Sequence, residues 1–189
     1  MKYISIAMFI LLISFAAGRA LWLRKKGINA FVFGVTNKSD IMLLPIIIAF
    51  FYTLLAGVFA WPIPQILIKH FFISIVADIL GILVCAAGLI WFAYTLKSFG
   101  NSFRIGIDEN TSDKLITKGA FAYSRNPIYS AFIIFFVGIF LLNPNITCVA
   151  LLIFLTIIIH RQVLREEKFL QKHYGDAYKT YCKRVRRYF

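Results

Sequence analysis

Long apolar runs, separated by short polar segments, dominate the pattern of this 189-residue chain. Five of them stand out, at residues 3–23, 41–61, 71–96, 128–142 and 146–160. A helix needs about 20 apolar residues to cross a bilayer, and the first three runs reach that length. The last two are shorter and are joined by Asn143-Pro144-Asn145, a turn signal that predicts a tight helical hairpin. We therefore predict an all-α polytopic membrane protein with five transmembrane helices.

The composition agrees with a membrane protein. Hydrophobic residues make up 60% of the chain and charged residues 15%, and the mean hydropathy is +0.79. Soluble domains are about 45–50% apolar and about 25% charged, which excludes a soluble enzyme, a disordered chain and a disulfide scaffold. The three Cys and three His are scattered, without the spacing of metal ligands or of a redox motif. We predict no metal site.

The basic residues indicate how the predicted helices are oriented. The chain carries 21 Lys and Arg against 8 Asp and Glu, a formal net charge of +13. Of the 21 basic residues, 18 follow the first, third and fifth runs, which five crossings place on one side of the membrane. The positive-inside rule makes that side cytoplasmic. We expect the N-terminus outside and the C-terminus inside, in the inner or plasma membrane if the source is a prokaryote, and the charge then needs no nucleic-acid partner.

Two features of the apolar runs leave alternatives open. Residues 1–20 also have the pattern of a signal peptide, although the run resumes and then stops at Arg24-Lys25-Lys26, as a stop-transfer flank does. Asp78 is the one acidic residue within the five runs. An acid there suits a proton or cation pathway, an interhelical hydrogen bond, or a position near the outer interface.

The polar segment before the fourth run ends in a motif that indicates both the start of a helix and a binding site for an anion. In Arg125-Asn126-Pro127, Asn as N-cap and Pro in the first turn are a normal beginning of a helix. Arg125 is not explained in this way, because a cation opposes the helix dipole at an N-terminus. We therefore expect an anionic partner there, a carboxylate or phosphate that Arg125 and the free helix N–H groups bind.

The segment after the fifth run, residues 161–181, predicts a helix on the inner membrane surface. It contains adjacent carboxylates, Glu166 and Glu167, with Arg161 and Arg165 nearby. The simpler interpretation of this pattern is a solvated charged face. Two neighbouring carboxylates in so acid-poor a chain also suit the binding of a cationic ligand group.

Two motifs resemble a known family. They read Gly119-x-Phe121-x3-Arg125-Asn126-Pro127-x-Tyr129 and, after the fifth run, Glu166-Glu167-x2-Leu170-x3-Tyr174-Gly175-x2-Tyr178-x2-Tyr181. In this order they resemble the isoprenylcysteine carboxyl methyltransferases, and the related phospholipid N-methyltransferases share the C-terminal pattern. The likeness covers about residues 97–185, and the first three runs match the prokaryotic members in number and length. It implies a single membrane-embedded domain over residues 1–189, with a three-span half (1–96) and a cofactor-binding half (97–189).

The resemblance implies a pocket for S-adenosylmethionine between the 97–127 segment, the hairpin and the tail helix. The cofactor-binding residues that it implies are Lys114, Leu115, Ile116, Gly119, Phe121, Arg125, Asn126, Pro127, Tyr129, Glu166 and Glu167. The candidate catalytic residues are Arg161, Arg165 and Glu167.

Three positions depart from the family pattern. Asn126 stands where the family has His, and Phe121 where it commonly has Tyr. Gln162 stands where the family has an Arg associated with the carboxylate substrate, and Arg161 or Arg165 is the nearest replacement.

The residue types suit a cofactor that combines a zwitterionic amino acid with a sulfonium. Arg125 suits its carboxylate, Glu166 or Glu167 its ammonium, and an aromatic side chain its adenine or sulfonium. We predict methyl transfer to a lipophilic acceptor, such as a prenylcysteine carboxylate, that enters from the bilayer. The alternatives are phospholipid N-methylation, a small transporter or channel that uses Asp78, and a non-catalytic lipid- or nucleic-acid-binding protein with a basic tail.

Overall fold

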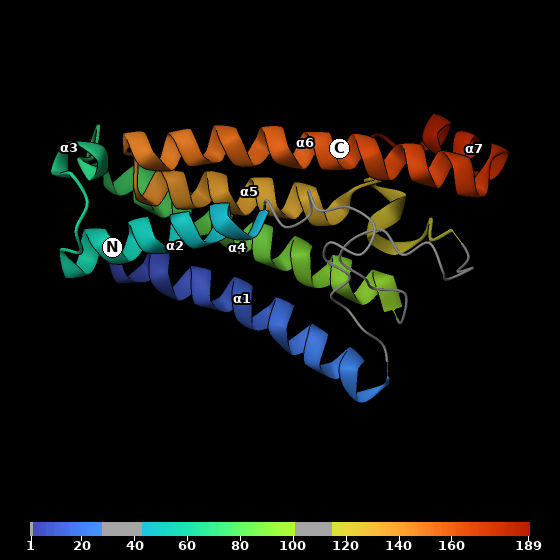
Figure 1. Cartoon of the computed structure of the whole chain (residues 1–189), viewed down its shortest axis with the longest axis horizontal. Helices are drawn as coiled ribbons and strands as arrows, with labels where there is room; N and C mark the ends of the chain where they lie inside the picture. Colours follow the sequence, from blue (N-terminus) through green and yellow to red (C-terminus); the bar gives the residue numbers. More distant parts are fainter. Residues whose placement is uncertain (1, 28–42, 101–114) are drawn as a thin grey trace.

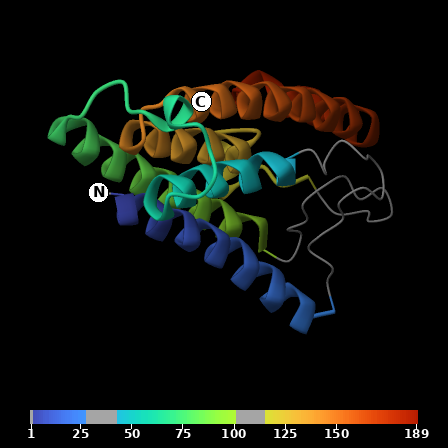
Figure 2. The same ribbon diagram turned by 60° about the vertical axis from the view of Figure 1, so that its left-hand side comes forward.

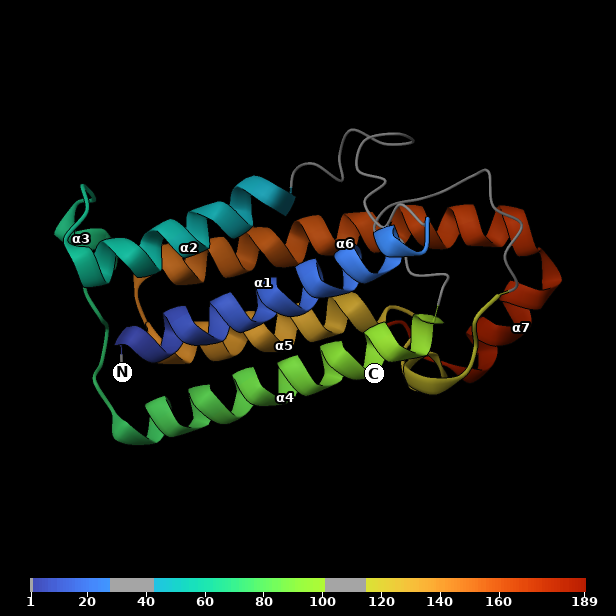
Figure 3. The same cartoon turned by 90° about the horizontal axis from the view of Figure 1, so that it is seen from below.

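The computed structural model describes residues 2–27, 43–100 and 115–189, and this part of the chain is all-helical. Five main helices lie side by side, and each runs opposite to the one before it (Figures 1 and 3). They are α1 (Lys2–Lys25), α2 (Leu43–Phe59), α4 (Ile75–Phe99), α5 (Pro127–Leu142) and α6 (Ile146–Tyr174). The short elements are α3 (Gln65–Ile68), the 3-10 helix η3 (Gly119–Ala122) and α7 (Asp176–Arg184).

The helices match the predicted apolar runs closely. Three of them, α1, α4 and α6, are long and apolar enough to cross a membrane, while α2 and α5 are shorter apolar helices of 17 and 16 residues. Large apolar side chains point outward along the bundle, for example Ile90 with 71% of its surface exposed and Ile153 with 57%. Such a surface indicates a bilayer environment, because soluble proteins rarely expose large contiguous apolar areas.

The fifth apolar run ends at residue 160, but the helix that contains it does not end there. The span and most of the tail form one unbroken helix, α6, of 29 residues (Figure 2). No Gly or Pro interrupts this stretch, and the helix ends only at Gly175, whose φ of +54° suits glycine. At 1.5 Å per residue α6 is about 44 Å long, more than the roughly 30 Å hydrocarbon core. Its last turns therefore project beyond the apolar layer.

The other end of the bundle holds the turn between α5 and α6. The Asn145 side chain caps α6, because its Oδ1 accepts a hydrogen bond from the Cys148 N–H at 2.9 Å. This confirms the predicted helical hairpin. Asp78 lies in the first turn of α4, where the helix dipole stabilises a carboxylate. That position agrees with the alternative that placed Asp78 near the outer interface.

Small residues bring α4 and α5 into close contact. A Cβ at Gly88 would lie 2.8 Å from the Phe135 backbone nitrogen, and one at Gly138 would lie 2.6 Å from Cys85 Sγ. Such residues let membrane helices approach closely. The contact fixes the start of α5 beside the end of α4, which is where the polar site forms.

Candidate functional site

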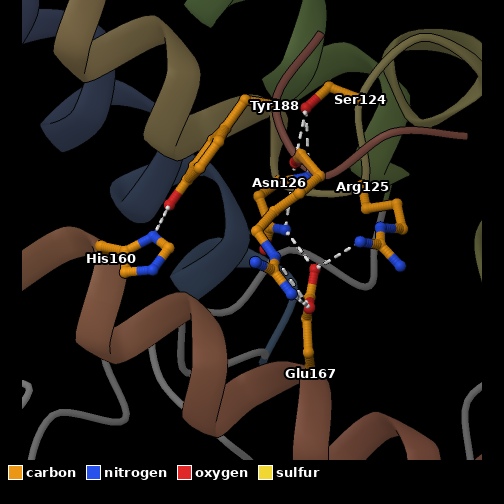
Figure 4. A network of polar contacts seen from close by, with 7 residues as sticks. Ser124, Arg125, Asn126, His160, Glu167 and Tyr188 are labelled. Atoms are coloured by element: carbon orange, nitrogen blue, oxygen red, sulfur yellow. Dashed lines mark hydrogen bonds and ion pairs between the residues drawn. The ribbon is translucent and has the colours of Figure 1, made fainter. Parts of the chain in front are cut away.

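Polar side chains from three distant segments meet near the end of the bundle opposite α3. They come from the link between η3 and α5, from the second half of α6, and from residues 185–189, where the chain turns back after α7 (Figures 1 and 4). In Figure 4, Arg125 and Asn126 point toward Glu167, and Tyr188 points toward His160.

Glu167 is the centre of this cluster, and its side chain is only 11% exposed. Its Oε1 accepts a hydrogen bond from Asn126 Nδ2 at 3.1 Å and lies 3.3 Å from an Arg125 guanidinium nitrogen. Its Oε2 accepts from Arg187 Nε at 3.0 Å and lies 2.9 Å from the Arg187 Nη2. A carboxylate has about four acceptor positions, so these contacts occupy Glu167 on both oxygens. The simpler sequence interpretation, a solvated charged face, is therefore wrong for Glu167.

Glu166 meets different groups. Its Oε1 accepts a hydrogen bond from the Tyr129 hydroxyl at 2.6 Å and another from Gln162 Nε2 at 3.1 Å. Tyr129 lies in the first turn of α5, so both carboxylates of α6 contact the beginning of that helix. These two donors orient the Glu166 carboxylate.

The start of α5 is built as the sequence predicts, with one difference. Asn126 is the N-cap residue and Pro127 follows it in the first turn. The Asn126 side chain does not cap the helix, however, but donates from Nδ2 to Glu167 and to the Arg187 carbonyl oxygen at 3.2 Å. The anionic partner expected beside Arg125 is Glu167 itself.

Arg125 retains a donor that the described part of the chain does not use. Its side chain is 13% exposed, and its Nε is buried without a hydrogen-bond partner among the described residues. A buried N–H of a guanidinium is costly to leave unpaired. An added carboxylate beside Arg125 would satisfy it.

The position of η3 depends on a close approach of its backbone to α4. Gly119 has a φ of +66°, and a Cβ there would lie 2.5 Å from Ser98 Oγ, so only glycine fits. The Ser98 hydroxyl accepts a hydrogen bond from the Ala120 N–H at 3.0 Å. Phe121 is buried, with its ring edge-on to Phe99 at 4.7 Å between centroids.

The short helix α7 holds η3 from the other side. The Tyr181 hydroxyl donates to the Phe121 carbonyl oxygen at 2.7 Å. Burial raises the pKa of Tyr181 well above its usual value, and burial together with nearby Glu167 does the same to the pKa of Tyr178. Both phenols therefore stay protonated under ordinary conditions.

The structure shows which of the candidate site residues lie together and which lie apart. It brings together Arg125, Asn126, Tyr129, Glu166 and Glu167. Pro127 and Phe121 are buried beside them, and Gly119, Leu115 and Ile116 are partly buried in the preceding segment. The side chains of Arg161 and Arg165 are exposed on α6, whereas Gln162 between them is buried. Lys114 lies outside the described residues.

Sequence reasoning missed Arg187, Ser124 and the role of Gln162. Arg187 was counted only as part of the basic tail, although the aromatic residues after it, Tyr188 and Phe189, are a signal that this segment packs. The Ser124 hydroxyl accepts from the Asn126 N–H at 3.1 Å and shapes the turn before α5. No spacing of residues in the sequence predicts the contacts of Arg187, Ser124 or Gln162.

Comparison with known proteins agrees with the motifs. A family model described as phospholipid methyltransferase matches residues 76–177, more than half of the chain. A probable protein-S-isoprenylcysteine O-methyltransferase of Oryza sativa subsp. indica is 31% identical over 121 residues, 62% of this chain and 61% of that protein. Protein-S-isoprenylcysteine O-methyltransferase B of Arabidopsis thaliana is 32% identical over 91 residues, 47% of this chain and 45% of that protein.

The chain thus spans about three fifths of the rice relative and less than half of the Arabidopsis one. No solved structure gives a significant match. The matched residues 76–177 include α4, α5, α6 and both sequence motifs up to Gly175. The family resemblance predicted from the residues is confirmed, and the chain belongs to the phospholipid methyltransferase family, with isoprenylcysteine O-methyltransferases among its relatives.

Proposed function

We propose that this protein is an integral membrane methyltransferase that uses S-adenosylmethionine and methylates a lipophilic acceptor. The observation that carries the proposal is the meeting of Glu166 and Glu167 with Arg125, Asn126 and Tyr129. This cluster joins both sequence motifs across two helices of the matched region. Its charges of both signs suit a zwitterionic cofactor.

The contacts refine which residue binds which part of the cofactor. Glu167 is already held by two arginines and an amide, so we assign the cofactor ammonium to Glu166, which the Tyr129 hydroxyl and the Gln162 amide orient. We assign the cofactor carboxylate to Arg125, because its buried Nε has no hydrogen-bond partner in the described part of the chain. Leu115, Ile116, Gly119 and Phe121 supply the apolar wall beside it.

When bound, S-adenosylmethionine supplies an electrophilic methyl group. The residues of this chain then have to hold both reactants in line and to exclude water, which accounts for most of the rate in such transfers. Pro127 and Phe121 are buried, so we assign them to the apolar side of the site that excludes water. A carboxylate acceptor is ionised at neutral pH and needs no general base, so the lack of His at the defining positions of the motifs is compatible with it.

We propose a prenylcysteine-type carboxylate as the acceptor, as in the names of the rice and Arabidopsis relatives. Arg161 and Arg165, both exposed on α6, are candidates for its carboxylate. Phospholipid amine methylation is the second candidate, supported by the description of the matching family. We also propose five membrane crossings with the N-terminus outside, which agrees with the alternating helix directions and places the site on the cytoplasmic side.

Calorimetry of the purified protein with S-adenosylmethionine tests the cofactor. We expect Glu166→Gln and Arg125→Ala to weaken binding, while Asp78→Asn, at the opposite end of α4, binds like the wild type. A folded wild-type protein that binds no S-adenosylmethionine contradicts the proposal. An equal loss in all three variants indicates general destabilisation instead of a site.

Labelled S-adenosylmethionine with a panel of acceptors then tests the substrate. We expect the label to enter prenylcysteine analogues as an alkali-labile methyl ester. Transfer to phosphatidylethanolamine, stable to alkali, favours the phospholipid alternative.

A further inference from the structure

Residues 185–189, called here the return segment, lie across the candidate site rather than in solvent. After α7 the chain turns back and ends beside α6 and the second half of α4 (Figures 1 and 3). The neighbouring basic residues Arg184 and Arg186 are exposed, whereas Arg187 and Tyr188 are partly buried. One side of the return segment therefore faces the protein, although the sequence analysis treated these residues only as part of the basic tail.

The backbone of the return segment binds the turn that starts α5. The Arg125 N–H donates to the Arg186 carbonyl oxygen at 3.0 Å. The Arg187 carbonyl oxygen accepts from Asn126 Nδ2 at 3.2 Å and from the Ser124 hydroxyl at 3.4 Å. Three consecutive residues of the site, 124–126, are thus tied to two consecutive residues of the segment.

The side chains of the return segment reach two further helices. The Arg187 guanidinium binds Glu167 Oε2 through two nitrogens, at 2.9 and 3.0 Å. The Tyr188 hydroxyl lies 2.9 Å from His160 Nδ1 on α6, and the Phe189 ring packs 5.7 Å from the Trp91 ring on α4. The segment joins α4, the start of α5 and α6 at the site.

The charges give Arg187 a specific task. Arg125 and Arg187 approach Glu167 from opposite oxygens, and the hydrogen bond to Glu167 raises the pKa of Arg187. Both Arg187 nitrogens contact the same oxygen, Oε2, while Arg125 and Asn126 contact Oε1, so the carboxylate is held at both of its oxygens. Without Arg187, Oε2 of this largely buried carboxylate would lose both contacts that the described part of the chain gives it, and the carboxylate would be free to rotate away from Arg125.

We propose that Arg187 is a positioning residue of the methyltransferase site. It fixes the Glu167 carboxylate, which in turn orients Arg125 and Asn126 toward the bound cofactor. The inference rests on the proposed function, because it concerns the cofactor site, but its residue contacts are independent of the acceptor.

The test compares Arg187→Ala, Arg187→Lys and Arg184→Ala, the last being an exposed basic neighbour on α7. Calorimetry with S-adenosylmethionine should show weakening on the order of 10-fold or more for Arg187→Ala, since small misplacements of binding groups are this costly. Arg187→Lys should restore part of the affinity, because Lys keeps the charge but not the planar fork. Arg184→Ala should match the wild type. In turnover, the KM for S-adenosylmethionine should rise more than kcat falls.

A second background shows whether Arg187 acts through Glu167. In a Glu167→Gln protein, Arg187→Ala should have little further effect on cofactor affinity, and thermal unfolding of the same four proteins should show coupling between the two changes. Wild-type affinity in Arg187→Ala, or a full-size effect in the Glu167→Gln background, overturns the proposal. If Arg187→Ala does not fold, unchanged affinity in Arg187→Lys overturns it equally. Wild-type protein without cofactor binding contradicts the proposed function instead, and the thermal coupling then still measures the contact.

Discussion

Two adjacent glutamates of α6 have different surroundings, which fits the different roles that we propose for them. Successive residues of a helix point about 100° apart, so Glu167 turns inward to Arg125 and Arg187 while Glu166 meets Tyr129. Glu167 is occupied by cations, which suits a residue that holds others in place. Glu166, oriented by the Tyr129 hydroxyl and the Gln162 amide, fits the direct binding of a cationic group that we propose.

The contact between Tyr129 and Glu166 gives a sharp test of this division. Tyr129→Phe removes a hydrogen bond of 2.6 Å to a carboxylate but keeps the ring. A hydrogen bond to a charged group contributes about 1.5–3 kcal/mol, so we expect about 10-fold weaker S-adenosylmethionine binding in calorimetry. Tyr123→Phe is the matched control, because that side chain is 66% exposed. Equal affinities for Tyr129→Phe and the wild type would show that Glu166 does not need this donor.

At the scale of elements, the site depends on the close contact between α4 and α5. Gly81, Gly88 and Gly138 line this contact, together with buried Cys85. At each of these glycines an added Cβ would lie within 3.0 Å of the facing helix. The contact holds the start of α5, with Asn126 and Tyr129, in place.

Gly88→Ala should therefore destabilise the protein. The new methyl group would meet the backbone of Phe135, which cannot move aside as a flexible side chain can. Overpacking of this kind costs about 1–3 kcal/mol, so we expect a lower thermal midpoint in detergent. Gly18→Ala on α1 is the control, since a Cβ there meets nothing within 4 Å. Two variants with the same midpoint would contradict this packing.

The packing of α7 against the rest of the protein should become weaker at alkaline pH. The pKa values of Tyr178 and Tyr181 are raised in the folded protein, mainly by burial. An unfolded chain loses these protons near pH 10 and the folded protein later, so the free energy of unfolding falls as pH rises above about 10. Below that pH the stabilisation is fully present. Tyrosinate absorbance should show a late phase that becomes smaller in a Tyr178→Phe/Tyr181→Phe variant, because Tyr188, whose pKa is also raised, remains. An unchanged late phase would argue against the prediction.

At the scale of the whole molecule, alternating helix directions gather the site at one end. The end of α4, the start of α5 and the projecting part of α6 lie there, while the α5–α6 turn and Asp78 lie at the other end (Figure 3). The positive charge of the chain follows the same division, which supports a cytoplasmic site.

Cysteine labelling tests this orientation. In a Cys182→Ser background, Lys69→Cys and Lys183→Cys place exposed thiols near opposite ends of the bundle, and the native Cys85 and Cys148 are buried. A membrane-impermeant maleimide added to intact cells should label Lys69→Cys only, and permeabilisation should expose Lys183→Cys. Both should label in detergent. The reverse pattern in intact cells would invert the proposed topology.

The sequence by itself determined the helices and the two motifs. Long apolar runs form helices almost wherever the pattern places them, because in a bilayer each backbone must satisfy its own hydrogen bonds. Glu166, Glu167, Arg125 and Tyr129 were identified from residue type and motif alone. The continuation of the fifth helix beyond residue 160 was missed, because an apolar pattern shows where the lipid-facing residues end and not where the helix ends. The helix continues to Gly175.

Only the tertiary structure decided which of these residues contact one another. Asn126 was expected to cap α5, yet its amide binds Glu167, 41 residues later, because α6 lies beside the start of α5. Arg187 shows the same limit, since its contact with Glu167 depends on the chain turning back after α7. Local patterns encode helices through backbone hydrogen bonds and burial, whereas such pairings depend on how separate helices pack, which no spacing within one segment records.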